Sequence, residues 1–267
     1  MGSVSAMQRI ITQINIENYP ESLRPLLTGA DIYDSRCASG AEVLFIDRDG
    51  GYFLKSMKRG ELEAEAKMTK YFGSLGLGAK VLHFEQTERD YMLTARVHGE
   101  DCTDARYLSD PARLCEVYAE LLYGLHQRDF SGCPVQNRVE SYRTLAYENY
   151  RTGNYDKDSF PDSFGYASAE EAMAVIKKYG SSLKNDTLIH GDYCLPNVML
   201  DDWRFSAFID VGNGGVGDRH IDLFWGVWTL WYNLKTNEYE DRFLDAYGRQ
   251  NFDRDMLRVV AAFEVFG

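Results

Sequence analysis

The order of hydrophobic and polar residues in the first hundred positions predicts several strands and one helix. The helix is expected over residues 60–75, where Met68, Tyr71 and Phe72 recur at helical spacing. Residues 48–51, Arg-Asp-Gly-Gly, form a polar turn of the kind that joins the two strands of a β-hairpin. The strands are expected at residues 42–47 and 52–57, on either side of that turn, and at residues 80–85 and 91–95.

After residue 103 the apolar residues follow a helical period instead. Asp110 and Pro111 are typical of a helix start, and an apolar stripe follows them. Ser168 and Glu171 have the spacing of a capping box, which begins a helix that Gly180 ends. Further helices are expected at residues 221–232, 238–247 and 254–266, and two short apolar strands at residues 187–189 and 205–209.

Together these elements predict an α+β fold with two lobes. We expect a small β-rich N-terminal lobe over residues 1–96, a polar connector over residues 97–103, and a larger, mainly helical C-terminal lobe over residues 104–267. A chain of 267 residues, 45% hydrophobic and 26% charged, is long enough to bury a sizeable core.

The charge and the cysteine content limit the kind of partner and compartment. The formal net charge of −12 argues against nucleic-acid binding, which needs a basic surface, and favours a cationic small molecule. No apolar run reaches the ~18 residues that a membrane span needs, and residues 1–16 lack the pattern of a signal peptide. The five cysteines are widely spaced and never form a CxxC pair, which indicates reduced thiols. We therefore expect a cytoplasmic protein that binds neither nucleic acid nor a membrane.

The strongest functional signal is a pair of motifs, each directly after a predicted strand: His-Gly-Asp-Tyr-Cys-Leu-Pro-Asn at residues 190–197 and Ile-Asp-Val-Gly at residues 209–212. Asp192 is placed to orient an attacking hydroxyl, and Asn197 and Asp210 supply the hard oxygen ligands that Mg²⁺ prefers. Either motif alone also fits a turn or a strand end. The two in this order predict phosphoryl transfer and, with the two lobes, the plan of a protein-kinase-like fold.

A kinase also needs a cation that holds the nucleotide phosphates and a carboxylate that fixes the cation. Lys55 lies on the second arm of the hairpin, and Glu65 shares the helix face that carries Met68 and Phe72. Residues 38–41, Ala-Ser-Gly-Ala, are small enough to let backbone N–H groups approach phosphate, although no GxGxxG or Walker motif is present.

Two further features bear on which residues take part in the reaction and on the type of reaction. His190 is expected to play a structural role by hydrogen bonding to the backbone of its loop. The absence of a GxSxG motif argues against a serine hydrolase.

With these residues in place, the chain resembles the aminoglycoside phosphotransferases, and most closely the 3′-type that modify kanamycin-like antibiotics. The resemblance covers roughly residues 35–267. It rests on residues 80–85, 116–134, 190–197 and 208–222.

The resemblance implies roles for individual residues. Asp192 would be the catalytic residue, Asn197 and Asp210 would bind Mg²⁺, and Lys55 would contact the ATP phosphates in a pair with Glu65. Further nucleotide contacts are implied for Ser39 and Gly40 in the loop before the hairpin, for Phe53 against adenine, and for Thr94, Ala95 and Arg96 at the hinge. Contacts with a cationic acceptor are implied for Asp158 and Asp162 on an insertion loop and for Glu264, Phe266 and Gly267 at the C-terminal end.

The chain also departs from the family pattern. Asn213 stands where the family usually has arginine. Aromatic or neutral residues replace carboxylates that 3′-type enzymes carry, at Trp228, Trp231, Tyr232 and Asn233 and, on the insertion loop, at Tyr155 and Ser159. The acceptor-binding surface is therefore expected to be less acidic and more aromatic. The tryptophans also fit core packing, because apolar residues repeat on the same helix.

The function that the resemblance implies is ATP-dependent phosphorylation of a hydroxyl, the 3′ hydroxyl, of an aminoglycoside, conferring resistance. GTP remains an alternative to ATP. A kinase of the same fold acting on a macrolide, choline or a sugar-like metabolite is the second hypothesis, and a nucleotide-binding pseudokinase is the third. We expect a monomer or a weak dimer.

Overall fold

The computed structural model describes residues 10–36, 40–155 and 164–267. They form two compact units. The first unit contains the chain up to Glu100 together with Met199–Gly212. The second contains Asp101–Val198 and Asn213–Gly267. The first is rich in strands and the second is mainly helical, as the sequence predicts.

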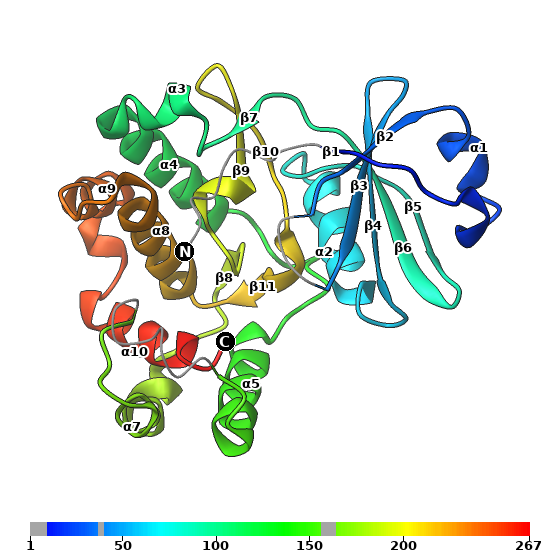
Figure 1. The fold of residues 1–267 in the computed structure, drawn as a ribbon. Coiled ribbons are helices and arrows are strands. Elements are labelled where there is room, and N and C mark those ends of the chain that lie inside the picture. The colour runs from blue at the N-terminus through cyan, green and yellow to red at the C-terminus, as the bar shows by residue number, and fades with distance from the viewer. Residues whose placement is uncertain (1–9, 37–39, 156–163) are drawn as a thin grey trace. The chain divides into compact units, whose positions relative to one another are not determined.

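The first unit is built on a six-stranded antiparallel sheet with the order β1-β2-β3-β4-β6-β5 (Figure 1). Its strands are β1 (Ile10–Ile11), β2 (Asp31–Asp34), β3 (Glu42–Asp47), β4 (Tyr52–Lys58), β5 (Val81–Gln86) and β6 (Arg89–Ala95). The other elements of the unit are η1 (Ile16–Asn18), α1 (Arg24–Leu27), α2 (Glu63–Ser74), β10 (Arg204–Phe208) and the neighbouring strand β9 (Val198–Asp201). The predicted hairpin and helix are confirmed.

The two faces of this sheet carry different residues, because side chains alternate along a strand. Leu54 of β4 is buried in a cluster with residues of the N-terminal segment, among them Leu23 and Leu27. Met57, on the opposite face, packs against Leu62 and Ala66 at the start of α2. Lys55 shares the face of Met57, so the alternation directs it toward α2.

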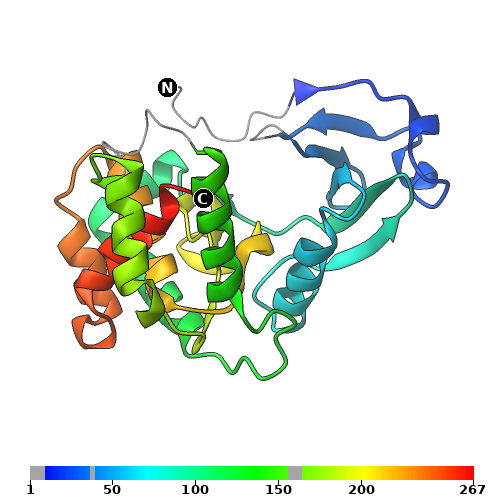
Figure 2. The ribbon, with the colours of Figure 1, turned by 90° about the horizontal axis from the view of Figure 1, so that it is seen from below.

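The second unit packs helices around one core. Its helices are α3 (Ala105–Leu108), α4 (Pro111–His126), α5 (Arg138–Thr152), α7 (Ala169–Tyr179), α8 (Arg219–Leu234), α9 (Glu240–Tyr247) and α10 (Arg254–Glu264), with 3₁₀ turns η2 (Gly180–Ser182), η3 (Leu195–Asn197) and η5 (Arg249–Asn251). Figures 1 and 2 show α5, α7 and α10 side by side. A short antiparallel pair, β8 (Thr187–Ile189) and β11 (Gly215–Gly217), lies within the unit.

Two predicted helix starts are confirmed by their caps. The Asp110 carboxylate accepts a hydrogen bond from the backbone N–H of Arg113 at 3.3 Å. The Ser168 hydroxyl accepts one from the N–H of Glu171 at 3.1 Å, and the Glu171 carboxylate reaches back to the N–H of Ala167 at 2.9 Å. Each cap satisfies donors that a helix leaves open at its start.

Some elements differ from the prediction. Helix α5 was not expected, because its sequence is polar and only Val139 and Ala146 are buried. The predicted connector contains a short strand, β7 (Glu100–Asp101), and a 3₁₀ turn, η4 (Val211–Asn213), overlaps the end of the second motif. The boundaries 1–96, 97–103 and 104–267 stay a prediction.

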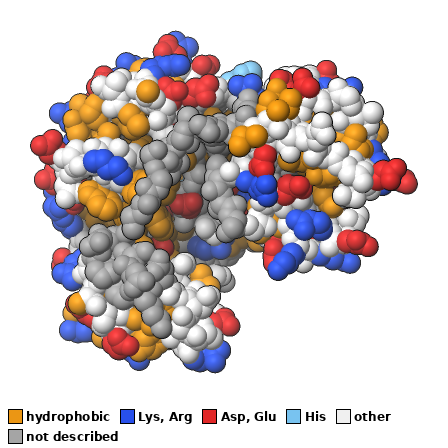
Figure 3. All heavy atoms as spheres, in the orientation of Figure 1, with side chains coloured by type: hydrophobic (Ala, Val, Ile, Leu, Met, Phe, Trp, Pro, Cys, Tyr) orange, Lys and Arg blue, Asp and Glu red, His pale blue; other side chains and the backbone are white. Residues whose placement is uncertain are grey.

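Among the described residues on the face drawn in Figure 3, acidic and basic side chains are interspersed. Among the described residues, no helix has the length and apolar character that a membrane span requires.

Candidate active site

The first motif forms a tight loop between β8 and β9. The Asn197 side-chain amide donates hydrogen bonds to the backbone oxygen and to the Oδ2 atom of Asp192, both at 3.0 Å. The backbone N–H of Cys194 donates to the same Asp192 carbonyl at 2.8 Å. The carboxylate of Asp192 is thereby oriented by Asn197, and the amide oxygen of Asn197 is the atom that would face a cation.

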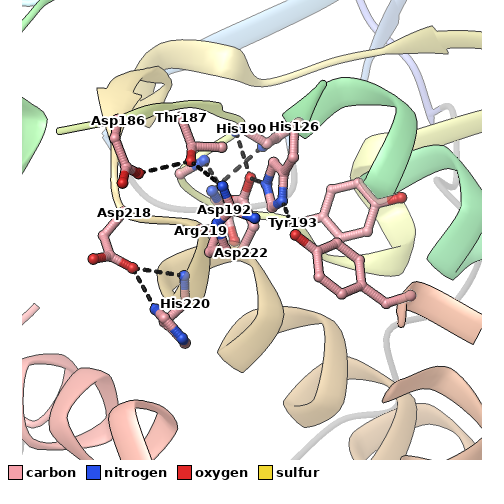
Figure 4. A network of polar contacts seen from close by, with 12 residues as sticks. His126, Asp186, Thr187, His190, Asp192, Tyr193, Asp218, Arg219, His220 and Asp222 are labelled. Atoms are coloured by element: carbon pink, nitrogen blue, oxygen red, sulfur yellow. Dashed lines mark hydrogen bonds and ion pairs between the residues drawn. The ribbon is translucent and has the colours of Figure 1, made fainter. Parts of the chain in front are cut away.

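A buried aspartate on α8 holds the start of this loop (Figure 4). The Asp222 carboxylate accepts hydrogen bonds from the backbone N–H groups of His190 and Gly191, both at 2.7 Å. His126 Nε2 lies 3.1 Å from the same carboxylate, and His126 Nδ1 lies 2.8 Å from the hydroxyl of Tyr247. Burial lowers the pKa of His126, so a neutral imidazole donates through Nε2 and accepts from Tyr247.

Gly191 is required by both its backbone conformation and its surroundings. Its φ of +83° lies in the left-handed region, and a Cβ there would meet the backbone oxygen of Asn213 at 1.9 Å. Asn213 is followed by Gly214, whose carbonyl accepts two hydrogen bonds from the Arg138 guanidinium at 3.1 and 2.7 Å. The loop therefore rests on a backbone segment that is itself held in place.

Two tyrosines fasten the next residues of the loop to α4. The rings of Tyr118 and Tyr193 stack at 4.4 Å, and each hydroxyl donates to the backbone oxygen of the other residue, at 2.5 and 2.8 Å. Thr229 of α8 accepts a hydrogen bond from the N–H of Leu195 at 3.1 Å. The loop is thus tied to α4 and α8 on either side of Cys194.

His190 plays the structural part that the sequence predicts. Its Nδ1 accepts a hydrogen bond from the backbone N–H of Asp192 at 3.3 Å, and its side chain is buried. The ring supports the loop from within.

The second motif contributes to a charged cluster in the first unit. Lys55 Nζ lies 2.8 and 2.9 Å from the two carboxylate oxygens of Glu65 and 3.0 Å from Oδ1 of Asp210. Burial alone would lower the pKa of Lys55, but the charges of Asp210 and Glu65 outweigh it and raise the pKa. Burial also raises the pKa of Glu65. The predicted pairing of Lys55 with Glu65 is present, and Asp210 is the most exposed of the three side chains at 58%.

The other residues implied in nucleotide binding lie on neighbouring strands of the same sheet. Phe53 of β4 is opposite Thr94 of β6 in the strand register, and its ring lies 5.2 Å from that of Phe45. Ala95 ends β6, and the N–H of Arg96 donates to the carbonyl of Gly51 at 3.0 Å. Gly40, with a φ of +120°, precedes β3, and Ser39 lies outside the described residues. Their contacts with a nucleotide stay predictions.

The C-terminal residues that the resemblance implies in substrate binding are only partly accessible. Glu264 Oε1 accepts hydrogen bonds from the Tyr142 hydroxyl at 2.5 Å and from the Trp225 indole at 3.0 Å. Phe266 is fully buried against Tyr150 and Tyr155, which leaves its side chain no exposed surface for a ligand. Gly267 is exposed, and Asp158 and Asp162 lie outside the described residues.

The environment of Glu264 is unusual for a carboxylate. Burial raises its pKa to about 7, against the hydrogen bonds from Tyr142 and Trp225, and the negative charge of Asp192 raises it further. Among the residues that the structure describes, no lysine or arginine forms an ion pair with it. The contact of Glu264 with a cationic acceptor stays a prediction.

The aromatic residues of α8 pack partly into the core. Trp225 and Trp228 lie against the main core cluster of the second unit but stay half-buried. Asn233 donates to the backbone oxygen of Thr229 at 2.8 Å, within the helix. The tryptophans therefore pack against the core with part of each ring and leave the rest exposed.

The side-chain oxygen atoms of Asn197 and Asp210 are chemically suited to bind Mg²⁺. The Asp210 carboxylate and the Asn197 amide are hard oxygen ligands of the kind Mg²⁺ prefers, and the ion usually completes its shell with phosphate and water. The part of the chain that the structure describes holds no cluster of three or more His, Cys, Asp or Glu side chains suited to a metal. Asn197 and Asp210 belong to different units, so their joint binding of one ion stays a prediction.

Sequence reasoning missed several residues that position the site. Asp222 and His126 were not singled out, although a carboxylate inside the apolar run Ile221–Phe224 is a signal of a buried polar contact. Tyr118 lies in the apolar stripe that follows Asp110 and Pro111, and nothing in the sequence indicates its hydrogen bond to Tyr193.

Known phosphotransferases are similar to this protein over nearly the whole chain. A family model described as "Phosphotransferase enzyme family" matches residues 35–260. The "Probable aminoglycoside 3′-phosphotransferase" of Lactococcus lactis subsp. lactis is 46% identical over 257 residues, which cover 96% of this chain and 97% of the relative.

Two solved structures share the fold. An aminoglycoside 3′-phosphotransferase of type VIII matches with a TM-score of 0.76 and 23% identity, covering 94% of this chain and 99% of that chain. The aminoglycoside phosphotransferase APH(3″)-Id from Streptomyces rimosus, solved with ADP and streptomycin, matches with a TM-score of 0.70 and 23% identity, covering 84% and 90%.

The fold is therefore that of the protein-kinase-like phosphotransferases, as the sequence predicts. The chain belongs to the phosphotransferase enzyme family. It is an enzyme that transfers a phosphoryl group to a hydroxyl acceptor.

Proposed function

We propose that this enzyme transfers the γ-phosphoryl group of ATP to the 3′ hydroxyl of an aminoglycoside and thereby confers resistance. The observation that carries the proposal is the 46% identity, over almost the full length of both chains, to a relative named as an aminoglycoside 3′-phosphotransferase. The Asp192–Asn197 and Lys55–Glu65–Asp210 arrangements support it, because they provide the groups that phosphoryl transfer uses.

In this proposal each side chain has one task. Asp192 accepts a hydrogen bond from the acceptor hydroxyl and orients it for attack, so its contribution comes from its position. Lys55, fixed by Glu65, holds phosphate oxygens. Asn197 and Asp210 would bind Mg²⁺, which, when bound, neutralises phosphate charge.

A kinase for a different small hydroxyl compound, such as a macrolide, choline or a sugar-like metabolite, is the second candidate. The half-buried aromatic residues of α8 favour it, because they suit an acceptor with apolar faces.

The experiment that separates the two candidates is a nucleotide-release assay with Mg²⁺-ATP and a panel of acceptors. Kanamycin and neomycin should be turned over, and an aminoglycoside that lacks the 3′ hydroxyl should not. Turnover of a macrolide or choline, without turnover of any aminoglycoside, would establish the second candidate. Repeating the panel with GTP determines the nucleotide.

The carboxylate of Glu264 should make acceptor binding depend on pH. Its pKa is raised to about 7, so the side chain gains a proton as the pH falls through that value. Only the ionised form attracts a substrate ammonium group, so kcat/KM for the acceptor should fall, by up to about tenfold per pH unit below the pKa.

The control for this pH dependence is Glu264→Gln. This variant keeps the acceptor atom for Tyr142 and Trp225 but has no proton to gain, so its profile should lack the step. A step of the same size in both proteins would show that another group, in the enzyme or in the substrate, is responsible.

A further inference from the structure

One face of α8 runs alongside the catalytic loop. Trp225, Trp228, Thr229 and Tyr232 occupy positions i, i+3, i+4 and i+7, which share one side of a helix. Thr229 accepts the hydrogen bond from Leu195 of the loop, and Trp225 donates to Glu264. This face therefore begins beside the carboxylate that Asp192 influences and continues along the helix away from it.

The aromatic rings on this face contact one another in series. The rings of Trp225 and Trp228 meet edge-on at 5.3 Å, and those of Trp228 and Tyr232 stack at 5.0 Å with 10° between their planes. The Lys235 ammonium lies 4.1 Å from the centre of the Tyr232 ring. All three rings are half-buried, whereas the core ring of Phe243 is fully buried. We call Trp225, Trp228 and Tyr232 the α8 aromatic platform.

The indole of Trp228 has an unusual hydrogen-bonding state. Its Nε1 atom is buried and has no acceptor among the described residues, whereas the Trp225 indole is bonded to Glu264. Buried donors without an acceptor are rare in folded proteins, because the lost contact with water is not replaced. The free energy lost at Trp228 is regained when a ligand supplies an oxygen atom.

We propose that the α8 aromatic platform determines acceptor specificity, and that Trp228 Nε1 donates a hydrogen bond to a hydroxyl or ether oxygen of the acceptor. This inference rests on the proposed function and names the substrate chemistry of the same site. The ring faces supply apolar contact, and the single N–H fixes orientation, which is the usual composition of a small-molecule site.

The donor makes the platform selective. An N–H group pairs with a hydroxyl or ether oxygen, but an ammonium group has only hydrogens to offer and leaves the indole unpaired. The faces of the rings attract cations as well. The preference for a hydroxyl over an ammonium group therefore comes from the indole N–H of Trp228 and not from the ring faces. The platform thus favours an acceptor that carries a hydroxyl, rather than an ammonium group, at the contacted position.

The test uses Trp228→Phe, which keeps an aromatic face and removes the N–H. Trp203→Phe, in the turn between β9 and β10, is the control that makes the same substitution outside α8. Two acceptor pairs differ by one group: paromomycin carries a hydroxyl where neomycin carries an ammonium, and kanamycin A and kanamycin B differ likewise at another position. The quantity measured is the ratio of kcat/KM within each pair. A partly unfolded variant does not distort this ratio, because the concentration of active enzyme cancels.

In Trp228→Phe the preference for the hydroxyl-bearing acceptor should fall about threefold to tenfold in at least one pair, which is the effect of one hydrogen bond. The loss should appear in KM and not in kcat, and Trp203→Phe should keep the wild-type ratio. Ratios in Trp228→Phe that stay within twofold of wild type for both pairs would overturn the proposal.

A binding measurement separates this proposal from the proposed function. Titration of paromomycin should change the tryptophan fluorescence of the wild type and of Trp203→Phe, and most of that change should be lost in Trp228→Phe. An equal change in all three proteins overturns the role of Trp228, even if aminoglycosides are phosphorylated. No turnover of any aminoglycoside by the wild type overturns the proposed function, whereas a Trp228-dependent change would still support the platform.

Discussion

Replacing Asp192 with asparagine should lower kcat by about two to four orders of magnitude while KM for nucleotide and acceptor changes little. Asparagine keeps an oxygen for the hydrogen bond from Asn197, so the loop should retain its shape. What is lost is the negative charge that orients and polarises the acceptor hydroxyl. Steady-state kinetics with saturating Mg²⁺-ATP measure the effect, and thermal unfolding should show that stability is nearly unchanged.

A matched substitution shows whether the effect belongs to this carboxylate. Asp201 ends β9, the strand that follows the loop, and is exposed, so Asp201→Asn also removes one carboxylate charge without touching the loop. It should keep wild-type kcat within about twofold, since surface substitutions rarely matter. If Asp192→Asn retained more than a tenth of wild-type kcat, the catalytic role of Asp192 would have to be abandoned.

Replacing Gly191 with alanine should cost both stability and activity. The added Cβ would lie 1.9 Å from the Asn213 oxygen and 2.3 Å from its carbonyl carbon, and the φ of +83° is itself unfavourable for alanine. Neither side can yield easily, because Asp222 holds the Gly191 N–H and Arg138 holds Gly214. We expect a loss of at least about 3 kcal/mol in the free energy of unfolding and a fall in kcat of more than a hundredfold.

The control for this substitution is Gly124→Ala. Gly124 lies in α4 with no atom near its added Cβ, so alanine should raise stability by about 0.5–1 kcal/mol through helix propensity. Urea unfolding of the two variants therefore has opposite expected signs. A Gly191→Ala protein as stable and active as wild type would show that the contact with Asn213 is not maintained in solution.

Much of this fold can be predicted from local sequence patterns such as turns, alternating strands and helix caps. The hairpin of β3 and β4 follows from a glycine turn between alternating strands, and α4 and α7 start where Asp110 and Ser168 cap them. These features depend on residues close together in the chain. Helix α5 escaped prediction for the opposite reason, because its helical state is stabilised by packing and not by a strong apolar stripe.

The sequence also predicts the candidate catalytic and binding residues of the site. It does not predict the residues that hold them in position. Asp192, Asn197 and Asp210 follow strands in a recognisable order, and the Lys55–Glu65 pair follows from a strand and a helix face. The contact between Asp222 and the His190–Gly191 backbone joins residues more than thirty positions apart. No local pattern encodes such a contact. The raised pKa of Glu264 likewise depends on how Tyr142 and Trp225 enclose it.

The reciprocal hydrogen bonds of Tyr118 and Tyr193 bear on protein engineering. Each hydroxyl donates to the carbonyl of the other residue, so changing one tyrosine to phenylalanine removes one of these buried hydrogen bonds and changing both removes two. A catalytic loop grafted from this protein into another scaffold would carry Tyr193 without its counterpart. The unit that can be transferred is therefore the loop together with the middle of α4, and libraries that randomise one tyrosine should randomise the other with it.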